Sequence, residues 1–350
     1  MQLIYKPIKV KGTTLKQLSI LTTGIALTLG ALPVLADNEF KINGFINVIG
    51  SISDSETEYA NEIADKVNFD STNLGIVLTK NINSKLSVAT QLHGQNGVFG
   101  FDWGYINYHI DSELSAKAGR IKYAGNLVSE TFDVGVTYPW IRPPISIYGD
   151  RARLSFESYN GASIVYMAGD DIEYSAEFII GDAQSEGITN EGMLGVVLTA
   201  ATDNIQLRAS YNNTTMKLDN FNPNNPNQVL MEGKSMDTFG FGLKAEYDIA
   251  TVYAEYAFTS MPQNLENIGW YVTALHQMGQ WTPHITFQDY DNMFGRDQNS
   301  YILGLNRQLD TSTALKFELE FIDPTNKGFF EDVPVESSIT IFNISLNMVF

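Results

Sequence analysis

Residues 338–350, SITIFNISLNMVF, alternate apolar and polar side chains up to the last residue of the chain. Side chains of a β-strand point alternately to its two faces, so a period of two predicts a strand with one apolar and one polar face. The apolar face carries Phe342, Ile344, Leu346, Met348 and Phe350, and the polar face carries Asn343, Ser345 and Asn347.

The same division recurs along the chain, and in several segments the polar face is charged. Residues 315–321 place leucine and phenylalanine on one face and Lys316, Glu318 and Glu320 on the other. Residues 172–178, 205–212 and 237–249 show a similar split. Alternation alone fits both a soluble β-sandwich with an apolar core and a membrane barrel with an apolar outer face. Strand length and loop length have to distinguish the two.

Segmentation of the chain predicts sixteen strands, most of them as long as the roughly 9–11 residues with which a tilted strand crosses a bilayer. The predicted strands are 40–53, 69–81, 84–95, 98–111, 113–123, 161–169, 172–181, 193–201, 204–214, 237–249, 251–260, 268–278, 281–289, 300–309, 313–322 and 338–350. Short turns alternate with mostly longer connections, which include 54–65, 181–192, 214–236, 289–299 and 323–337. The sequence therefore predicts an all-β fold, a transmembrane antiparallel β-barrel of about 16 strands with both termini in the periplasm.

Composition narrows the function classes. The 350 residues include 22 Lys and Arg against 40 Asp and Glu, a net charge of −18, with four His and no Cys. These counts exclude a disulfide scaffold, a cysteine-ligated zinc site and a basic nucleic-acid binder. The histidines stand singly in predicted strands, with no H-E-x-x-H or G-x-S-x-G motif near them. We therefore expect no enzyme, no metal site, no cofactor and no nucleic-acid partner.

The first 36 residues predict a secretory signal peptide. Four lysines precede an uncharged apolar run over residues 18–32, and Pro33-Val34-Leu35-Ala36 supplies a small-residue cleavage site. An N-terminal membrane anchor is the alternative, but the run is short for a membrane span. Residues 37–350 are then the mature barrel, with 18 basic and 40 acidic side chains and a net charge of −22.

The C-terminal strand resembles the terminal signature of Gram-negative outer-membrane proteins, whose final Phe, here Phe350, is read by the barrel-insertion machinery. The alternative is an ordinary half-buried last strand of a secreted β-protein. With its strand and loop pattern, the whole mature chain resembles a sixteen-stranded porin of the general-diffusion type. That resemblance implies a homotrimer in the outer membrane of a Gram-negative bacterium, in contact with outer-membrane lipids and lipopolysaccharide.

In this family the third external loop, after strand five, folds into the barrel and narrows the pore. The longest connection here, 124–160, follows the fifth predicted strand, so the resemblance makes it the constriction loop. Its aromatic residues favour an ordered loop, and we expect Tyr138 and Trp140 to pack at its base rather than to stack on solutes. Gly119-Arg120 is similar to the porin Gly-Arg step that places an arginine in the lumen. The segment 133–144 departs from the acid-rich third loops of common cation-selective porins, which leaves the ion preference open.

The candidate site residues are charges of this loop and of polar strand faces, because charges held in a narrow passage bias which solutes enter. For the pore constriction they are Arg120, Lys122, Glu130, Asp133, Arg142, Arg151 and Arg153, and for the lumen wall Arg208, Lys244, Glu246 and Glu318. The alternative for Arg142, Arg151 and Arg153 is a structural role in salt bridges to Glu130, Asp133 or Asp150.

The predicted function is a water-filled channel for passive diffusion of ions and small hydrophilic solutes. Two alternatives come from other classes. A non-conducting barrel would act as an adhesin, receptor or structural protein through its external loops. A barrel enzyme would need a serine, a histidine and an acid at its outer rim. The long loop after strand five and the charged polar faces favour the channel.

Overall fold

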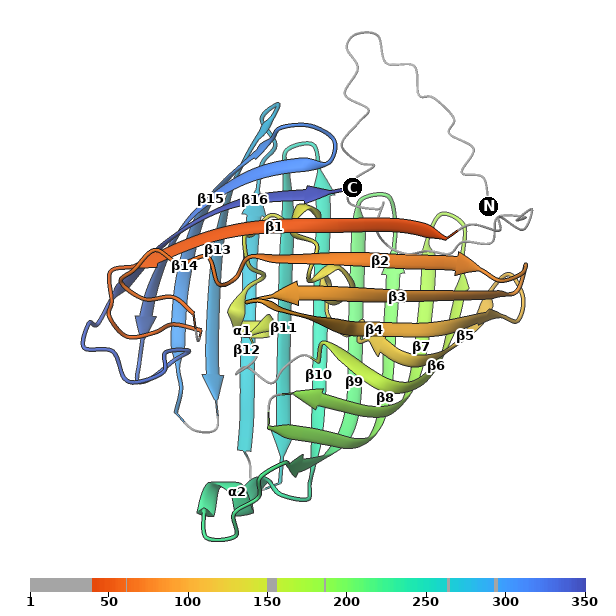
Figure 1. The fold of residues 1–350 in the computed structure, drawn as a ribbon, viewed down its shortest axis with the longest axis horizontal. Coiled ribbons are helices and arrows are strands. Elements are labelled where there is room, and N and C mark those ends of the chain that lie inside the picture. The colour runs from red at the N-terminus through yellow and green to blue at the C-terminus, as the bar shows by residue number, and fades with distance from the viewer. Residues whose placement is uncertain (1–39, 61, 150–155, 186, 263–264, 293–294) are drawn as a thin grey trace.

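The computed structural model describes residues 40–60, 62–149, 156–185, 187–262, 265–292 and 295–350. The predicted signal peptide, 1–36, lies outside these residues. Within them, sixteen antiparallel strands form one closed barrel (Figure 1), in which each strand pairs with its sequence neighbours and β1 (Lys41–Ser53) pairs with β16 (Ile339–Val349). The predicted sixteen-stranded barrel is confirmed.

The strands between these two follow the predicted order. They are β2 (Asn73–Asn81), β3 (Leu86–Gln95), β4 (Val98–His109), β5 (Leu114–Lys122), β6 (Ser158–Ala168), β7 (Glu173–Ser185), β8 (Ile188–Ala201), β9 (Ile205–Leu218), β10 (Lys234–Tyr247), β11 (Ala250–Met261), β12 (Leu265–Leu275), β13 (Trp281–Asn292), β14 (Gln298–Gln308) and β15 (Thr313–Pro324).

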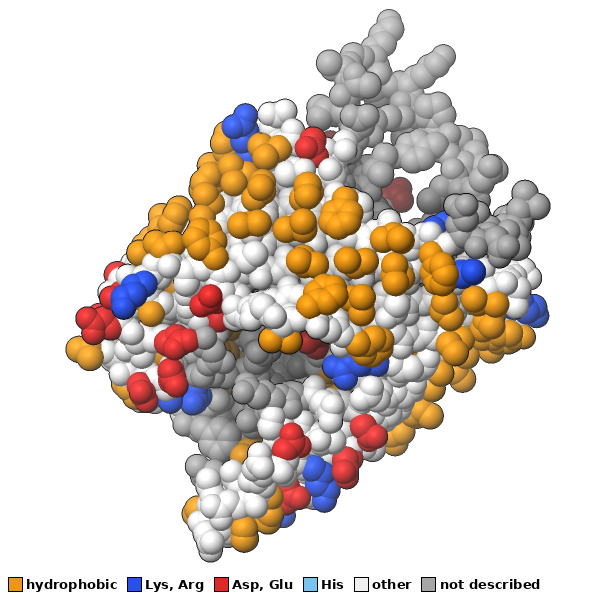
Figure 2. Space-filling view, viewed as in Figure 1, with side chains coloured by type: hydrophobic (Ala, Val, Ile, Leu, Met, Phe, Trp, Pro, Cys, Tyr) orange, Lys and Arg blue, Asp and Glu red, His pale blue; other side chains and the backbone are white. Residues whose placement is uncertain are grey.

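Burial along each strand is the reverse of that in a soluble protein. In β15, Lys316, Glu318 and Glu320 are buried, whereas Leu319 and Phe321 are exposed. In β16 the exposed residues include Phe342, Ile344 and Leu346. Figure 2 shows apolar side chains spread over the outer face of the barrel, with acidic side chains gathered at the end that carries the longer loops. Apolar side chains outside and polar side chains inside are the pattern of a membrane barrel.

The two ends of the barrel differ in their connections, as predicted. At the short-turn end, Asx side chains close several turns. Asn83 Oδ1 accepts from the backbone N–H groups of Lys85 and Leu86, and Asp111 Oδ1 accepts from those of Glu113 and Leu114. Hydrogen bonds from these two backbone N–H groups lower the pKa of the exposed Asp111 carboxyl from its ordinary value.

At the long-loop end, several predicted strand boundaries are wrong by a few residues. The predicted loop 181–192 is mostly strand, since β7 continues to Ser185 and β8 begins at Ile188. The ladder continues there through register shifts at 181–183 and 191–194, which sequence alternation does not reveal. The predicted loop 214–236 likewise contains the end of β9 and a helix, α2 (Pro226–Met231).

The remaining helices belong to the connection between β5 and β6. They are the short 3-10 helices η1 (Ser129–Thr131) and η2 (Gly135–Thr137) and the single turn α1 (Ile145–Tyr148). Among the residues that the structure describes, no helix is long and apolar enough to cross a membrane.

Candidate functional site

The connection between β5 and β6, residues 123–157 and here called the β5–β6 segment, is bonded to polar faces of distant strands. Trp140 is fully buried, and its Nε1 donates to the hydroxyls of Thr273 on β12 and Thr286 on β13 at 3.0 and 2.9 Å. Its ring packs edge-on against Tyr253 and Tyr271, with centroids 5.3 Å apart in both pairs. These contacts pack Trp140 tightly and hold the segment against β11, β12 and β13.

Lys316 on β15 makes the most concentrated contact with the segment. Its Nζ donates to the backbone carbonyls of Gly135, Tyr138 and Trp140 at 2.5, 2.7 and 2.6 Å. The residue is 1% exposed, so these carbonyls replace the water that the ammonium would otherwise bind. Residues 135–140 are thereby folded around the buried ammonium group of Lys316.

Neighbouring wall residues bind the same stretch of backbone. Glu318 Oε1 accepts from the N–H of Ile141 at 2.8 Å, and Asn306 Nδ2 donates to the carbonyl of Pro139 at 2.7 Å. Glu318, which the sequence analysis expects on the lumen wall, has its carboxylate buried against the β5–β6 segment.

Gly135 marks the closest approach of this segment to the wall. Its N–H donates to Asn47 Oδ1 on β1 at 3.2 Å, and Asn47 Nδ2 donates to the carbonyl of Asp133 at 2.7 Å. A Cβ at position 135 would lie 2.3 Å from Asn347 Nδ2 and 2.6 Å from Asn47 Oδ1. A larger residue would have to displace either the segment or the buried Asn47 and Asn347 side chains.

Arg142 bonds to neutral groups of the wall. Its guanidinium donates to Asn343 Oδ1 at 2.9 Å and to the hydroxyls of Ser51 and Ser71 at 2.9 and 2.7 Å. Burial lowers the pKa of Arg142 from its ordinary value, although nearby carboxylates of Glu62 and Glu318 oppose this. Within the described residues Arg142 forms no salt bridge to Glu130 or Asp133, and Asp150, the third expected partner, lies outside them. Its hydrogen bonds fasten the segment to β1 and β16.

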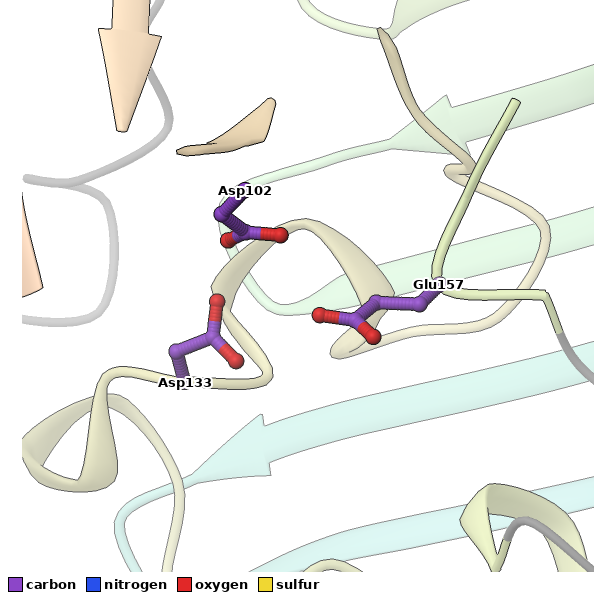
Figure 3. Close-up of side chains that lie close together, drawn as sticks. All are labelled: Asp102, Asp133 and Glu157. Carbon is purple, nitrogen blue, oxygen red and sulfur yellow. The ribbon is translucent and has the colours of Figure 1, made fainter. Parts of the chain in front are cut away.

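A charged cluster lies where the segment leaves β5 and returns to β6. Figure 3 shows the carboxyl groups of Asp102, Asp133 and Glu157 turned toward one another. One carboxylate oxygen from each residue lies within 4.8 Å of those from the other two. Lys122 Nζ lies 2.6 Å from Asp133 and 3.4 Å from Glu157. Gln91 Nε2 donates to Asp102 at 2.6 Å and to Asp133 at 2.8 Å. An ammonium and an amide already provide the positive charge and donors that these carboxylates require.

The pKa of Asp133 follows from this surrounding. Burial alone would raise the pKa of its carboxyl, but the charge of Lys122 and the hydrogen bonds from Lys122 and Gln91 hold it below the ordinary value. Asp133 therefore stays ionised in neutral and mildly acidic solution.

The opposite flank of the segment is held by Arg208 on β9. Its Nη1 donates to the backbone carbonyls of Ala124 and Asn126 at 2.9 and 2.8 Å, and its Nη2 lies 3.2 Å from Glu130 Oε2. Glu255 on β11 holds the next residue, accepting from the N–H of Leu127 at 2.7 Å. Glu255 also accepts from the hydroxyls of Tyr148 and Tyr271, at 2.5 and 2.6 Å.

In three ion pairs of the described residues, the basic side chain is much less exposed than the acidic one. Side-chain exposure is 9% for Lys122 against 52% for Glu157, and 9% for Arg208 against 50% for Glu130. It is 17% for Lys244 against 44% for Glu246. Two pairs show the opposite order: Lys117 and Glu177, with 22% and 11%, and Lys217 and Glu232, with 42% and 23%. In the first three of these pairs, the more exposed charge is therefore the carboxylate.

All candidate residues except Arg120 fall into three groups. Lys122, Glu130, Asp133, Arg142, Arg208 and Glu318 belong to the β5–β6 segment or bind it. Lys244 and Glu246 pair with each other on β10, where Lys244 also lies over the ring of Tyr253. Arg151 and Arg153 lie outside the described residues.

Arg120 binds neighbouring backbone, with its Nε donating to the carbonyl of Asp102 at 2.5 Å. The preceding Gly119 has a φ of 143°, and a Cβ there would lie 2.4 Å from the carbonyl oxygen of Gly104. Glycine is therefore required at position 119 because the backbone of β4 lies too close for a side chain.

Sequence reasoning did not select Lys316, Glu255 or Asn47, although all three bind the segment. The period-two pattern already assigns Lys316 to the same face as Glu318. Because Lys316 is a lysine on the same inward face as the acids Glu318 and Glu320, its contact with the segment could have been suspected. The sequence contains no comparable indication of which residues Glu255 and Asn47 bind.

Comparisons with known proteins agree with the barrel geometry. The sequence profile of the family described as Gram-negative porin matches residues 22–327. The fold is similar to the anion-selective porin from Comamonas acidovorans, with 14% identity and a TM-score of 0.61 over 89% of this chain and 99% of that one.

Two further solved structures are similar at comparable levels. OmpF of Salmonella typhi in complex with daunomycin has 14% identity and a TM-score of 0.61, over 89% of this chain and 97% of that one. The trimer form of OmpT from Vibrio cholerae has 11% identity and a TM-score of 0.57, over 89% and 99%. No curated protein matched by sequence.

Proposed function

Because the chain belongs to the Gram-negative porin family and forms an outer-membrane channel for passive diffusion of small solutes, we propose that its β5–β6 segment narrows that channel. The observation that carries the proposal is the set of bonds from residues 133–142 to inward-facing side chains of β1, β13, β15 and β16. Since those faces line the lumen, a segment bonded to them occupies part of its cross-section.

We infer that the narrowed channel prefers cations. Glu130 and Glu157 are half-exposed while their partners Arg208 and Lys122 are buried, so water beside the segment meets carboxylates first. Exposed acidic groups raise the local concentration of cations and lower that of anions.

The working unit that we infer is a homotrimer. The trimer form of OmpT, a protein of similar fold, supports this assembly. Contacts with lipopolysaccharide, and recognition of Phe350 by the insertion machinery, are further expectations carried by the sequence.

A unique cysteine tests whether the segment borders the conducting path. The chain contains no cysteine, so Glu130→Cys creates a single reactive site on η1. A cationic methanethiosulfonate reagent should lower the single-channel conductance of this variant in a planar bilayer, because the added group obstructs the path. Ser112→Cys, in the exposed turn between β4 and β5, is the matched control and should not respond. Labelling of residue 130 with unchanged conductance would contradict the proposal.

The reversal potential under a salt gradient tests the ion preference. The wild type should show the sign of a cation-selective channel, and Glu130→Gln should move the potential toward zero because one exposed carboxylate is lost. An anion-selective potential in the wild type would refute the inference.

A further inference from the structure

The outer face of β6–β12 carries two adjacent rows of residues in register across the strands. One row runs from Tyr166 on β6 to Trp270 on β12, and the other from Tyr174 on β7 to Val272 on β12. Tyr166, Tyr174 and Val272 are exposed, as expected of the face that contacts lipid.

Four positions in these rows are alanine. Ala176 and Ala209 belong to the first row, and Ala200 and Ala254 to the second. Between them stand larger side chains, including Phe241. The wall is hollowed along these rows, and the hollow has a volume of about 830 Å³. Its lining is almost entirely apolar.

The hollow rises obliquely through one leaflet. Tyr166 and Tyr174 lie beside the short turn between β6 and β7, whereas Trp270 lies midway along β12. Neighbouring strands are about 4.8 Å apart, so the five spacings from Tyr174 on β7 to β12 span roughly 24 Å. With strands tilted by about 40°, this path rises by roughly 15 Å, about half of the ~30 Å hydrocarbon core. Short turns lie on the periplasmic side, which assigns the hollow to the periplasmic leaflet.

The low end of the hollow is acidic. The turn between β6 and β7 contains Asp170 and Asp171, and both are exposed. The adjacent turn contributes Glu113, whose carbonyl accepts from the N–H of Met167 at 2.8 Å. A headgroup seated there meets several carboxylates, which attract an ammonium group and repel a lipid with net negative charge.

We propose that this hollow binds an acyl chain of a periplasmic-leaflet phospholipid whose headgroup carries an ammonium group. The chain follows the alanine positions from Tyr174 toward Trp270, and the headgroup lies beside Asp170 and Asp171. This site is on the outside of the barrel and is independent of whether the β5–β6 segment narrows the channel.

Native mass spectrometry of the delipidated, refolded protein tests the site with two probes, phosphatidylethanolamine and phosphatidylglycerol of identical acyl chains. Phosphatidylethanolamine should bind more tightly. Ala209→Phe and Ala254→Phe fill the hollow and should weaken its binding roughly tenfold, because about two methylene groups lose their contacts. Ala118→Phe is the matched control, since Ala118 also faces outward, beside Ile106, but lies on β5 away from the hollow.

Three results would overturn the proposal. One is equal binding of phosphatidylethanolamine by all three variants and the wild type. Another is phosphatidylglycerol binding at least as tightly. The third is a wild-type oligomer that Ala209→Phe dissociates without changing lipid binding, which would assign the hollow to a second copy of the chain. Retention of the folded, heat-modifiable form on gel electrophoresis verifies that each variant has folded.

Discussion

Lys316→Met should loosen the β5–β6 segment while leaving the barrel intact. The lysine ammonium is the shared donor for three carbonyls, those of Gly135, Tyr138 and Trp140. Leaving a buried acceptor without a donor costs about 1–3 kcal/mol, so three would cost roughly 3–9 kcal/mol. Methionine keeps much of the volume and removes the cost of burying a charge, which favours the lower end, about 3 kcal/mol. The detached fraction of the segment should then rise by roughly two orders of magnitude.

Single-channel recording measures this loosening directly. We expect the open-channel current of Lys316→Met to fluctuate between levels, because the narrowing segment leaves and regains its place on the wall. Lys244→Met is the matched control: it removes an inward lysine whose partners are Glu246 and Tyr253 rather than the segment. A steady current in Lys316→Met with the wild-type amplitude would refute the argument that this clasp fixes the segment.

Three further changes probe the same region. Gly135→Ala introduces a methyl group 2.3 Å from Asn347 Nδ2. It should destabilise the docked segment by about 1–3 kcal/mol and lower the thermal unfolding midpoint. Gly100→Ala is the control and should change little, because the space around Gly100 is open. The pKa of the Asp133 carboxyl is lowered from its ordinary value of 3.8. Its pairing with Lys122 therefore stabilises the docked segment fully above pH 3.8, and this stabilisation is lost as the pH falls through the lower pKa of the folded state. Current fluctuations should therefore grow in strong acid, and Asp133→Asn should show them already at neutral pH; a pH-independent wild-type current would contradict this. Deletion of residues 127–150 should raise the single-channel conductance because a narrowing element is removed, and an unchanged conductance in a correctly folded barrel would argue against a constriction.

The barrel itself could be predicted because its signal is local. Alternation in segments such as 315–321 and 338–350 assigns each side chain to a face without reference to any other part of the chain. Membrane crossing fixes the minimum strand length, and alternating short and long connections fix the topology. The ends of the strands at the long-loop side were not predicted correctly. There the hydrogen bonding of each strand depends on its neighbour rather than on its own alternation, as in β7 and β8.

The candidate site was only partly predictable for the same reason. Sequence position identified the β5–β6 connection and charges such as Asp133 and Arg142, but not their partners. Arg142 binds Ser51 and Asn343, which are 91 and 201 residues away. Lys316 binds Gly135 across 181 residues.

By itself, then, the sequence determined which faces of the strands are polar, and hence that Lys316 and Glu318 point inward. Only the tertiary structure decided that Lys316 is surrounded by backbone carbonyls and that basic groups such as Arg208 are covered while Glu130 stays open to water. The physical reason is that periodicity encodes the direction of a side chain, whereas burial and pairing depend on which distant segment closes over it.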